Sequence, residues 1–322
     1  MDWTHKLRLR NLQMLLSLAE TGNMSHSAEA LHTTQPGLSK WLKELEDEIG
    51  LPLFERHARG LRPTAYGNAL IEHARRIEAH LDAAREDMLS MRVGGAGIVT
   101  IGFAGVSAVD TVPIAVLRIV RKIPNVHVKL FENNLGNLMS ALNSGEMDIV
   151  VGPSDFSALP PRVRAETLYA ESIHAVARKD HPIFELDTIT WQHVLAYPWA
   201  LWAKGTPVRR AFDRALETAG QKLPVHYVES NSAALNTALL LHSDMIGVTS
   251  QRPAIRWGSL NLLSVIPLSL GVLGAVSVYW REDSLNRIAV KAALDSIRET
   301  GRDASGGDLF HSTAAFADEG RN

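Results

Sequence analysis

The sequence contains no cysteine. This absence excludes disulfide bonds, thiolate-bound zinc and a cysteine nucleophile, and it fits a reducing compartment. Long apolar runs are missing as well, because no segment reaches the roughly 18 uninterrupted apolar residues of a membrane span and the N-terminus lacks a signal-peptide pattern. We therefore expect a cytoplasmic protein that makes no membrane contact.

An excess of charge of either sign is also absent. The 322 residues carry 33 Lys and Arg against 35 Asp and Glu, a formal net charge of -2 at pH 7. Any contact with nucleic acid must therefore be local and not a property of the whole surface. With 46% hydrophobic residues the chain can bury a core, and its length allows two or three domains of about 100 to 200 residues each.

The pattern of residues 1–65 predicts short helices followed by a turn-rich segment. Apolar residues at helical spacing end at Gly22, and a second short helix follows Ser25. A third helix is predicted to begin after an N-cap at Thr34 and to end at Gly50, with Pro36 in its first turn, where the missing N–H does no harm. The second and third helices form a predicted helix-turn-helix.

The strip LFERHARGLRPTAYG follows the third helix. Gly60 and Pro63 separate short extended pieces in it, a pattern typical of a tight β-hairpin. We interpret this hairpin as the wing of a DNA-binding domain that spans residues 1–65. Its arginines can reach backbone phosphates, although this domain carries as many acidic as basic residues.

The second helix of a helix-turn-helix enters the DNA major groove. Gln can pair with adenine there, Lys can donate to guanine or phosphate, and Ser can do either. Any one of these side chains alone could equally be an ordinary solvated residue. The presence of the wing beside them strengthens the prediction that the set binds DNA. The expected DNA-binding residues are Thr33, Thr34, Gln35, Pro36, Ser39, Lys40, Lys43, Arg56, Arg59 and Arg62.

Residues 66–94 predict one long linker helix. Its apolar residues alternate steps of four and three, which is the seam of a coiled coil, and glycines follow it as a flexible joint. The alternative, a helix lying on the core of its own domain, usually shows a wider apolar face. The expected dimerisation residues are Leu70, Ala74, Ile77, Leu81, Ala84 and Met88.

Residues 95–300 alternate short β-rich runs with amphipathic helices, as an α/β domain does. Two similar sets indicate two lobes with a cleft between them. We expect lobe 1 at about 95–170 and 270–300, and lobe 2 at about 171–269. Residues 301–322 show little periodicity and are expected to be a disordered tail.

The segment AEALHTTQPGLSKWLKELEDEIGLPLFERHARGLRPTAYG resembles the signature of LysR-type transcriptional regulators. The resemblance implies an α+β multi-domain protein with an N-terminal winged helix-turn-helix, a long linker helix and a C-terminal two-lobed α/β domain like that of periplasmic binding proteins. Trp41 and Gly37 depart from residues common at these positions in the family. The resemblance further implies a homodimer or homotetramer on promoter DNA, with RNA polymerase as a further candidate partner.

In this family the cleft between the lobes binds a small-molecule effector. Here IGFAGVSAVDTVP and WALWAKGTPVRR each lead from a strand into a helix N-terminus, which favours small anions. A plain helix cap or turn is the alternative for these residues. We expect a small anion or polar metabolite, and the expected effector-binding residues are Gly105, Ser107, Asn133, Trp202, Lys204, Thr206, Ser230 and Asn231.

Enzyme interpretations are weaker. The segment GVSAV lacks the second glycine of a nucleophile elbow, and the GGAG run precedes a strand where a dinucleotide loop would follow one. The histidines are dispersed, so we expect no metal, no cofactor and no catalytic residue.

The sequence leaves two rival functions open. One is a cytosolic solute-binding or enzyme domain with an incidental helical N-terminal extension, and the other is a nucleoid architectural protein, which leaves the two lobes unexplained. The segment GVLGAVSVYWRED resembles the LysR subgroup with galactose-binding-protein and protocatechuate-pathway regulators, which spans sugars and aromatic acids. The effector, the target genes and the direction of regulation therefore stay open.

Overall fold

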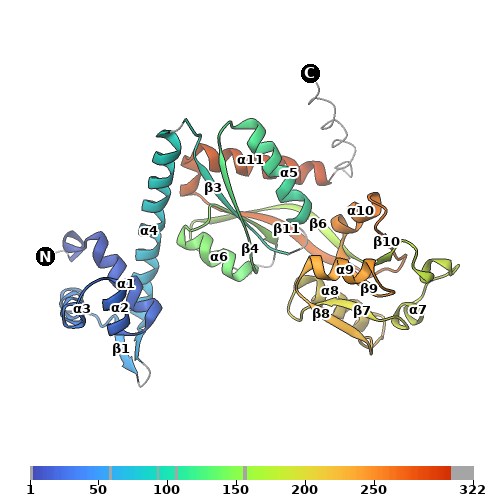
Figure 1. Ribbon diagram of the computed structural model, residues 1–322, viewed down its shortest axis with the longest axis horizontal. Coiled ribbons are helices and arrows are strands. Elements are labelled where there is room, and N and C mark those ends of the chain that lie inside the picture. Colours follow the sequence, from blue (N-terminus) through green and yellow to red (C-terminus); the bar gives the residue numbers. More distant parts are fainter. Residues whose placement is uncertain (1–2, 58–59, 93, 106–107, 155–157, 306–322) are drawn as a thin grey trace. The chain divides into compact units, whose positions relative to one another are not determined.

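The computed structural model describes residues 3–57, 60–92, 94–105, 108–154 and 158–305 (Figure 1). The chain divides into two compact units, one formed by residues 1–93 with 140–147 and the other by residues 94–139 with 148–322. In the described part of the chain, no helix combines the length and the apolar character that a membrane crossing needs.

The described residues of the first unit before residue 93 form a short 3-10 helix, four α-helices and a two-stranded hairpin. The sequence predicts the α-helices and the hairpin. In chain order these elements are η1 (Trp3–Lys6), α1 (Leu9–Thr21), α2 (Met24–Ala30), α3 (Gln35–Ile49), β1 (Phe54–His57), β2 (Gly60–Pro63) and α4 (Ala65–Arg92).

The predicted ends of α1 and α3 are present. Gly22 and Gly50 take left-handed conformations, with φ of 58° and 77°, and so close α1 and α3. At the start of α3, the hydroxyl oxygen of Thr34 accepts a hydrogen bond from the Gly37 N–H at 3.2 Å. The apolar stripe of α3 then packs into the core of this unit, so that its polar stripe faces outward.

The hairpin is fixed to the helices by specific contacts. The Glu46 carboxylate, near the end of α3, accepts hydrogen bonds from the N–H groups of Leu53 at 2.6 Å and Phe54 at 3.0 Å. These bonds anchor the start of β1. At Gly67, in the first turn of α4, an added Cβ would lie 2.0 Å from the Leu53 carbonyl oxygen, so only glycine fits. The wing therefore holds a defined place against α3 and α4.

Helix α4 differs in one respect from the expected coiled-coil seam. Ala74 is fully buried in the core of its own unit and offers no surface to a partner, whereas Leu70 packs against the same core but stays half-buried. Further along, the exposed fractions are 44% for Ile77, 47% for Leu81 and 60% for Met88. The helix thus starts as part of the core, which was the alternative interpretation, and continues as an unpaired apolar stripe.

The second unit is a mixed α/β structure. Its helices and strands are β3 (Ile98–Phe103), α5 (Ala108–Lys122), β4 (His127–Glu132), α6 (Leu135–Ser144), β5 (Ile149–Pro153), β6 (Val163–Arg178), η2 (Pro182–Glu185), α7 (Trp191–Leu195), β7 (Trp199–Trp202), α8 (Pro207–Thr218), β8 (Tyr227–Ser230), α9 (Ala233–Leu241), β9 (Ile246–Ser250), α10 (Gln251–Ser259), β10 (Leu263–Val265), β11 (Val272–Arg281), η3 (Asp283–Asn286) and α11 (Ile288–Ser305).

One sheet runs through both lobes of this unit. Its strand order is β4-β3-β5-β11-β6-β9-β7-β8, with β10 paired to β6. Strands β6 and β11 are antiparallel to each other and pass from one lobe to the other. Parallel strands at each end, β3 with β4 and β5, and β7 with β8 and β9, carry the loops that face the cleft.

The two lobes have separate apolar cores. Strand β6 contributes Tyr169 to the core under α5 and α11 and Ile173 to the core under α8, so the core changes between these two residues. Helices α5 and α11 pack against each other over the first core (Figure 1). Helix α11 continues to Ser305, past the expected start of the tail at residue 301, and residues 306–322 lie outside the described residues.

Candidate nucleic-acid interface and ligand cleft

Helix α3 presents a polar face at its N-terminal end. Gln35, Lys40 and Lys43 are exposed, whereas Ser39 is half-buried. The Lys40 ammonium lies 3.8 Å from the Glu44 carboxylate in a solvent-exposed pair, which leaves the lysine able to exchange partners. Among the other expected residues of this face, Thr34 and Pro36 are exposed and Thr33 is half-buried.

The wing carries its arginines on two different faces. In the antiparallel register Glu55 pairs with Arg62, and Arg56 pairs with Leu61. Because paired residues share a face and neighbours alternate, Arg62 lies on the face of Glu55 while Arg56 lies on the opposite face. Both arginines are exposed, and the third expected arginine, Arg59, lies outside the described residues.

A cavity of about 580 Å³ opens between the two lobes of the second unit, a size typical of small-molecule sites. Loops after β3 and β4 line it from lobe 1, and loops after β7 and β8 line it from lobe 2. Of the expected effector residues, those that line the cavity are Gly105, Asn133, Trp202, Thr206 and Asn231. Lys204 and Ser230 are not among its lining residues, and Ser107 lies outside the described residues.

Hydrogen bonds hold the lobe 2 side of this cavity in place. The buried Arg209 guanidinium donates to the Trp202 carbonyl oxygen at 3.1 Å and to the Glu229 carboxylate at 2.9 Å. Its hydrogen bond lowers the pKa of Glu229, which keeps this carboxylate charged. The Thr206 hydroxyl donates to Ala203 O at 2.8 Å and accepts from Arg209 N at 3.4 Å. The loop before α8 is therefore preformed.

Asparagines and serines of the remaining loops act first as helix caps. Asn134 Oδ1 accepts from the Asn137 N–H at 2.9 Å at the start of α6, and Ser232 Oγ accepts from the Leu235 N–H at 3.2 Å at the start of α9. Asn133 Oδ1 accepts from the Asn134 N–H at 2.8 Å. These contacts support the turn role that the sequence left open for this pair, while both asparagines also line the cavity.

Arg210 is the cation among the lining residues of the cavity, whereas the sequence interpretation named Lys204. Arg210 lines the cavity, and its Nη1 donates to the Gly205 carbonyl oxygen at 2.6 Å, which holds the side chain against the loop. Lys204 is exposed, with its backbone N–H 3.4 Å from the Glu229 carboxylate. The sequence does hold a signal for this cation, the consecutive pair Arg209 and Arg210. Only one of two neighbouring residues in the first turn of a helix can face the core, so the other is left to face the cavity.

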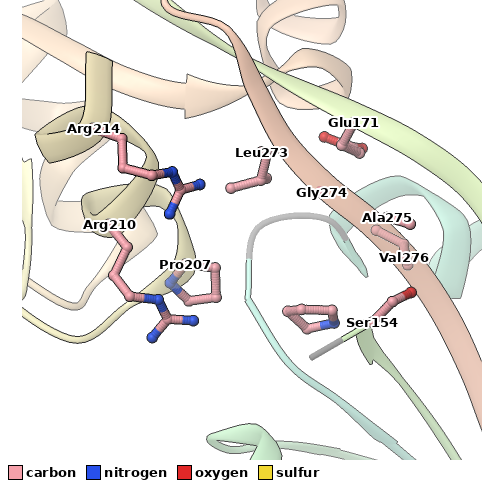
Figure 2. A pocket seen from close by; sticks show the side chains of 10 residues that line it. Ser154, Glu171, Pro207, Arg210, Arg214, Leu273, Gly274, Ala275 and Val276 are labelled. Atoms are coloured by element: carbon pink, nitrogen blue, oxygen red, sulfur yellow. The ribbon is translucent and has the colours of Figure 1, made fainter. Parts of the chain in front are cut away.

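A smaller pocket of about 160 Å³ adjoins this cavity, because Pro153, Pro207, Arg210 and Leu273 line both. Figure 2 shows Arg210 and Arg214 reaching in from α8, while Glu171 lies on the strand side of the pocket. Glu171 is only 2% exposed. We call this space the side pocket.

A buried polar cluster lies behind the side pocket, where the lobes meet. The Arg252 guanidinium stacks over the Tyr169 ring at 3.6 Å, and its Nε lies 3.4 Å from the Glu171 carboxylate. The hydroxyls of Tyr169 and Thr111 are 2.7 Å apart, and Arg252 Nη1 is 3.4 Å from the latter. Since these residues belong to α5, β6 and α10, the cluster joins elements of both lobes.

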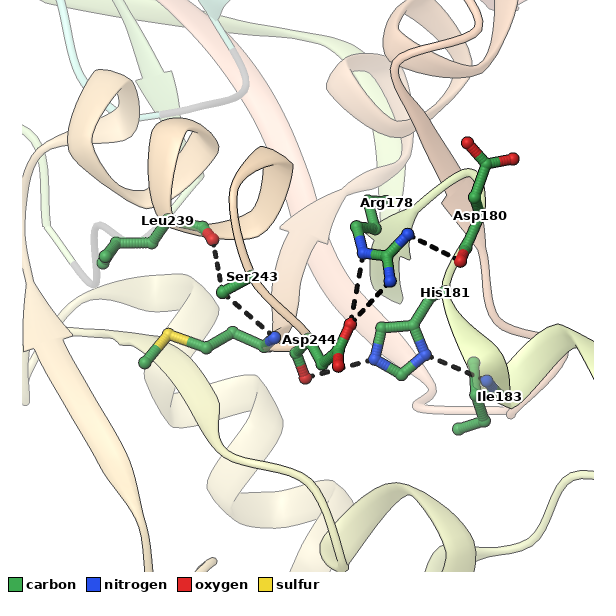
Figure 3. Close-up of polar contacts among 8 residues, drawn as sticks. Arg178, Asp180, His181, Ile183, Leu239, Ser243 and Asp244 are labelled. Carbon is green, nitrogen blue, oxygen red and sulfur yellow. Dashed lines mark hydrogen bonds and ion pairs between the residues drawn. The ribbon is translucent and has the colours of Figure 1, made fainter.

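Another polar cluster, inside lobe 2, has a structural role. The Arg178 guanidinium contacts the Asp244 carboxylate at 2.7 Å and donates to the Asp180 carbonyl oxygen at 2.6 Å (Figure 3). His181 is 1% exposed, and its Nδ1 accepts from the Ile183 N–H at 3.0 Å while Nε2 lies 3.1 Å from Asp244 O. These contacts tie the end of β6 to the turn before β9.

Comparison with known proteins matches both units of the chain. Residues 92–302 match the family model described as LysR substrate binding domain, and residues 9–68 match the one described as bacterial regulatory helix-turn-helix protein, lysR family.

Individual relatives agree with these matches. The chain is 30% identical to the HTH-type transcriptional regulator GalR of Pseudomonas putida over 294 residues, which cover 90% of this chain and 73% of GalR. It is 27% identical over 300 residues to the regulator GbpR of Azospirillum brasilense, covering 91% of this chain and 86% of GbpR. Its fold is similar to full-length CbnR complexed with target DNA, with a TM-score of 0.62, 19% identity, and 91% and 100% of the two chains covered.

Proposed function

The chain belongs to the LysR family of DNA-binding transcriptional regulators, and on this premise we propose that a small anionic or polar metabolite, bound in the cavity between its two lobes, controls its activity. The observation that carries the proposal is the preformed 580 Å³ cavity with Arg210 in its wall. Polar residues in the loops around it, Asn133, Thr206 and Asn231, provide donors and acceptors for a polar ligand.

We propose a division of labour in DNA binding. The exposed residues Gln35, Lys40 and Lys43 of α3 contact base edges, and Arg56 and Arg62 of the wing contact phosphates. Because the two arginines lie on opposite faces of the hairpin, they contact different phosphates. Ser39 is half-buried, so its contact with DNA is more limited than the sequence interpretation assigned.

We also propose that a second copy of the chain covers the exposed stripe of α4. Ile77, Leu81 and Met88 have large exposed fractions, and Ala84 is exposed between them. Burying such a stripe against its copy removes apolar surface from water, which is the main driving force of association. A dimer places two recognition helices on one DNA duplex, as a two-fold symmetric site requires.

Ligand control then follows from the position of the cavity. A ligand that contacts both lobes favours the arrangement in which those contacts are made, and it shifts the equilibrium by its difference in affinity for the two arrangements. The lobes are joined through β6 and β11, so this change acts on the strands that connect them.

Thermal-shift screening of the full-length protein against a metabolite panel tests this proposal, because a ligand that binds only the folded state stabilises it by mass action. We expect at least one anionic or polar compound to raise the unfolding temperature, and Arg210→Leu to reduce that shift while Lys204→Leu, a change of an equally charged exposed neighbour, leaves it unchanged. If Arg210→Leu responds like the wild type, the cavity does not hold the effector.

A further inference from the structure

We propose that His32, in the turn between α2 and α3, is a further DNA-contacting residue, and that its protonated ring donates a hydrogen bond to a backbone phosphate at the edge of the major groove. DNA binding is then coupled to the uptake of a proton. This inference rests on the proposed function and deepens it, since it adds a phosphate contact and a dependence on pH to the helix-turn-helix.

The backbone of the turn gives the first argument. His32 has a φ of 50°, in the left-handed region that glycine enters without steric cost. This conformation is held in place, because the N–H of His32 donates to the Glu29 carbonyl oxygen at 3.1 Å and the N–H of Thr33 donates to the Ala28 carbonyl oxygen at 2.9 Å. Turns of this motif often contain glycine. A side chain here bears a steric cost, which a contact outside the fold offsets.

The ring of His32 makes no hydrogen bond and no ion pair within the part of the chain that the structure describes. The residue is exposed to solvent. By contrast, the ring of His57 on the wing already has a partner, since its Nε2 lies 3.0 Å from the Glu55 carboxylate. Both ring nitrogens of His32 can therefore contact a partner outside the protein.

The place of His32 in the motif indicates which partner this is. Thr34 caps α3, and the exposed Gln35 begins the helix whose N-terminal residues enter the major groove. Three steps along the chain span at most about 11 Å, so the Cα atoms of His32 and Gln35 lie within that distance of each other. The major groove is about 12 Å wide, and phosphates line its edges. With Gln35 at base edges, the ring of His32 is within reach of a phosphate.

The charge of the DNA-binding domain makes one added proton important. Residues 1–65 carry as many acidic as basic side chains, so their formal charge does not attract a duplex. Histidine is the side chain that ordinarily gains a positive charge between about pH 8 and pH 5. A phosphate favours the charged ring, so the DNA-bound protein holds more protons than the free protein. Affinity for DNA therefore rises as the pH falls.

Other charged groups around the turn do not replace this contact. Glu29 is the acidic residue within three positions of His32, and its charge is present in the free and in the DNA-bound protein alike. The charged and titratable side chains of the helices that form or pack against the turn are His26 and Glu29 of α2, Lys40, Lys43, Glu44, Glu46, Asp47 and Glu48 of α3, and Arg10 and Glu20 of α1.

The test measures the DNA affinity of the full-length protein at pH 6 and pH 8, on a duplex carrying a site selected by the purified protein and on an unrelated duplex of equal length. At pH 6 we expect His32→Asn and His32→Gly to bind both duplexes about tenfold more weakly than the wild type, a loss typical of a charge-assisted hydrogen bond, and about twofold more weakly at pH 8. The slope of log affinity against log salt should fall by about one at pH 6.

Two controls separate a DNA contact from a change in the fold. Glycine and asparagine both fit the left-handed backbone, so the two variants should unfold at the temperature of the wild type or above it. His5→Asn removes another exposed histidine, on η1, whose Lys6 pairs with Glu48 at the C-terminal end of α3. It should leave the affinity and its pH dependence unchanged, because that end of α3 lies away from the groove.

Wild-type affinity of His32→Gly at pH 6, or a pH dependence of His32→Asn equal to that of the wild type, overturns the proposal. A lower unfolding temperature of both variants shows that the ring serves the fold and overturns it as well, and a loss confined to the selected duplex overturns the phosphate contact. If Gln35→Ala still reduces the preference for the selected duplex, the proposed DNA-binding face stands without His32. If neither Gln35→Ala nor His32→Gly changes binding, that face itself is wrong.

Discussion

Dimerisation through α4 can be tested by placing a charge on its exposed stripe. Fully burying an Ile or Leu side chain stabilises by about 1.5 to 3 kcal/mol. Ile77 is 44% exposed, so the dimer interface would bury about half a side chain from each copy, worth about 1.5 to 3 kcal/mol for the pair. Ile77→Asp loses this contribution and adds the desolvation of two unpaired carboxylates, several kcal/mol more.

The variant should therefore dissociate at concentrations at which the wild type is a dimer. A loss of at least about 3 kcal/mol corresponds to a more than hundredfold weaker dimer. Sedimentation velocity of the full-length protein measures this directly, and circular dichroism should show unchanged helix content because the core of the unit is held by other residues, such as Ile71 and Ala74.

The matched control is Arg75→Asp, which places the same carboxylate on an exposed position two residues earlier, on the opposite side of α4. It should leave the dimer unchanged within a few fold. An Ile77→Asp protein that remains a dimer of wild-type affinity would refute the reasoning, since a seam cannot tolerate that charge.

Further predictions concern reading of DNA, the wing, the contact between the lobes and pH. Gln35→Ala should reduce the preference for the selected DNA sequence in competition assays. Arg62→Ala should weaken binding to every DNA sequence by a similar factor and lower the slope of log affinity against log salt by about one. The reverse pattern would exchange the roles of the two residues. Gly67→Ala should lower the stability of the first unit by more than about 3 kcal/mol in thermal unfolding, because its Cβ would meet a backbone oxygen at 2.0 Å, and an unchanged melting temperature would contradict that packing. Arg252→Met should cost about 3 to 5 kcal/mol in urea unfolding by leaving a buried carboxylate without its cation, and a loss below 1 kcal/mol would show that other contacts carry the carboxylate. Burial lowers the pKa of His174 from its ordinary 6.5, so the unfolded chain takes up this proton first as the pH falls. The free energy of unfolding should therefore keep the contribution of His174 above about pH 6.5 and lose it below that pH. His174→Gln should make this decline less steep.

Local features of the first unit could be predicted because their signals are local. A hydroxyl cap at Thr34, a proline in the first turn and a glycine at position 50 mark both ends of α3 within a few residues of sequence. The surface that the apolar residues of α4 contact was harder to predict, because the spacing of Ala74 and Ile77 is the same whether they face the domain's own core or a second chain. Only the packing of α1 against α4 distinguishes the core-facing residue from the exposed one.

The candidate ligand site could be predicted only in part. The strand-to-helix loops indicated where the cleft lies, since helix N-termini follow strands there. The sequence interpretation chose Lys204 as the cation, whereas Arg210 lines the cavity; both lie within four residues of Thr206, and sequence spacing alone does not distinguish them. Glu171 gave no signal, because a single carboxylate in a strand becomes notable only when the fold buries it beside Arg252.

The most direct test of the account is whether a cleft ligand changes the way the protein holds DNA. A duplex carrying a site selected by the purified full-length protein, labelled at both ends, reports affinity and bending by fluorescence transfer in one titration. We predict that the strongest stabilising acid shifts affinity or bending for the wild type, and that Arg210→Leu binds the free duplex equally well but no longer responds. Identical responses of the two proteins, or no response of the wild type to any ligand that stabilises it, would contradict control of DNA binding from the cleft.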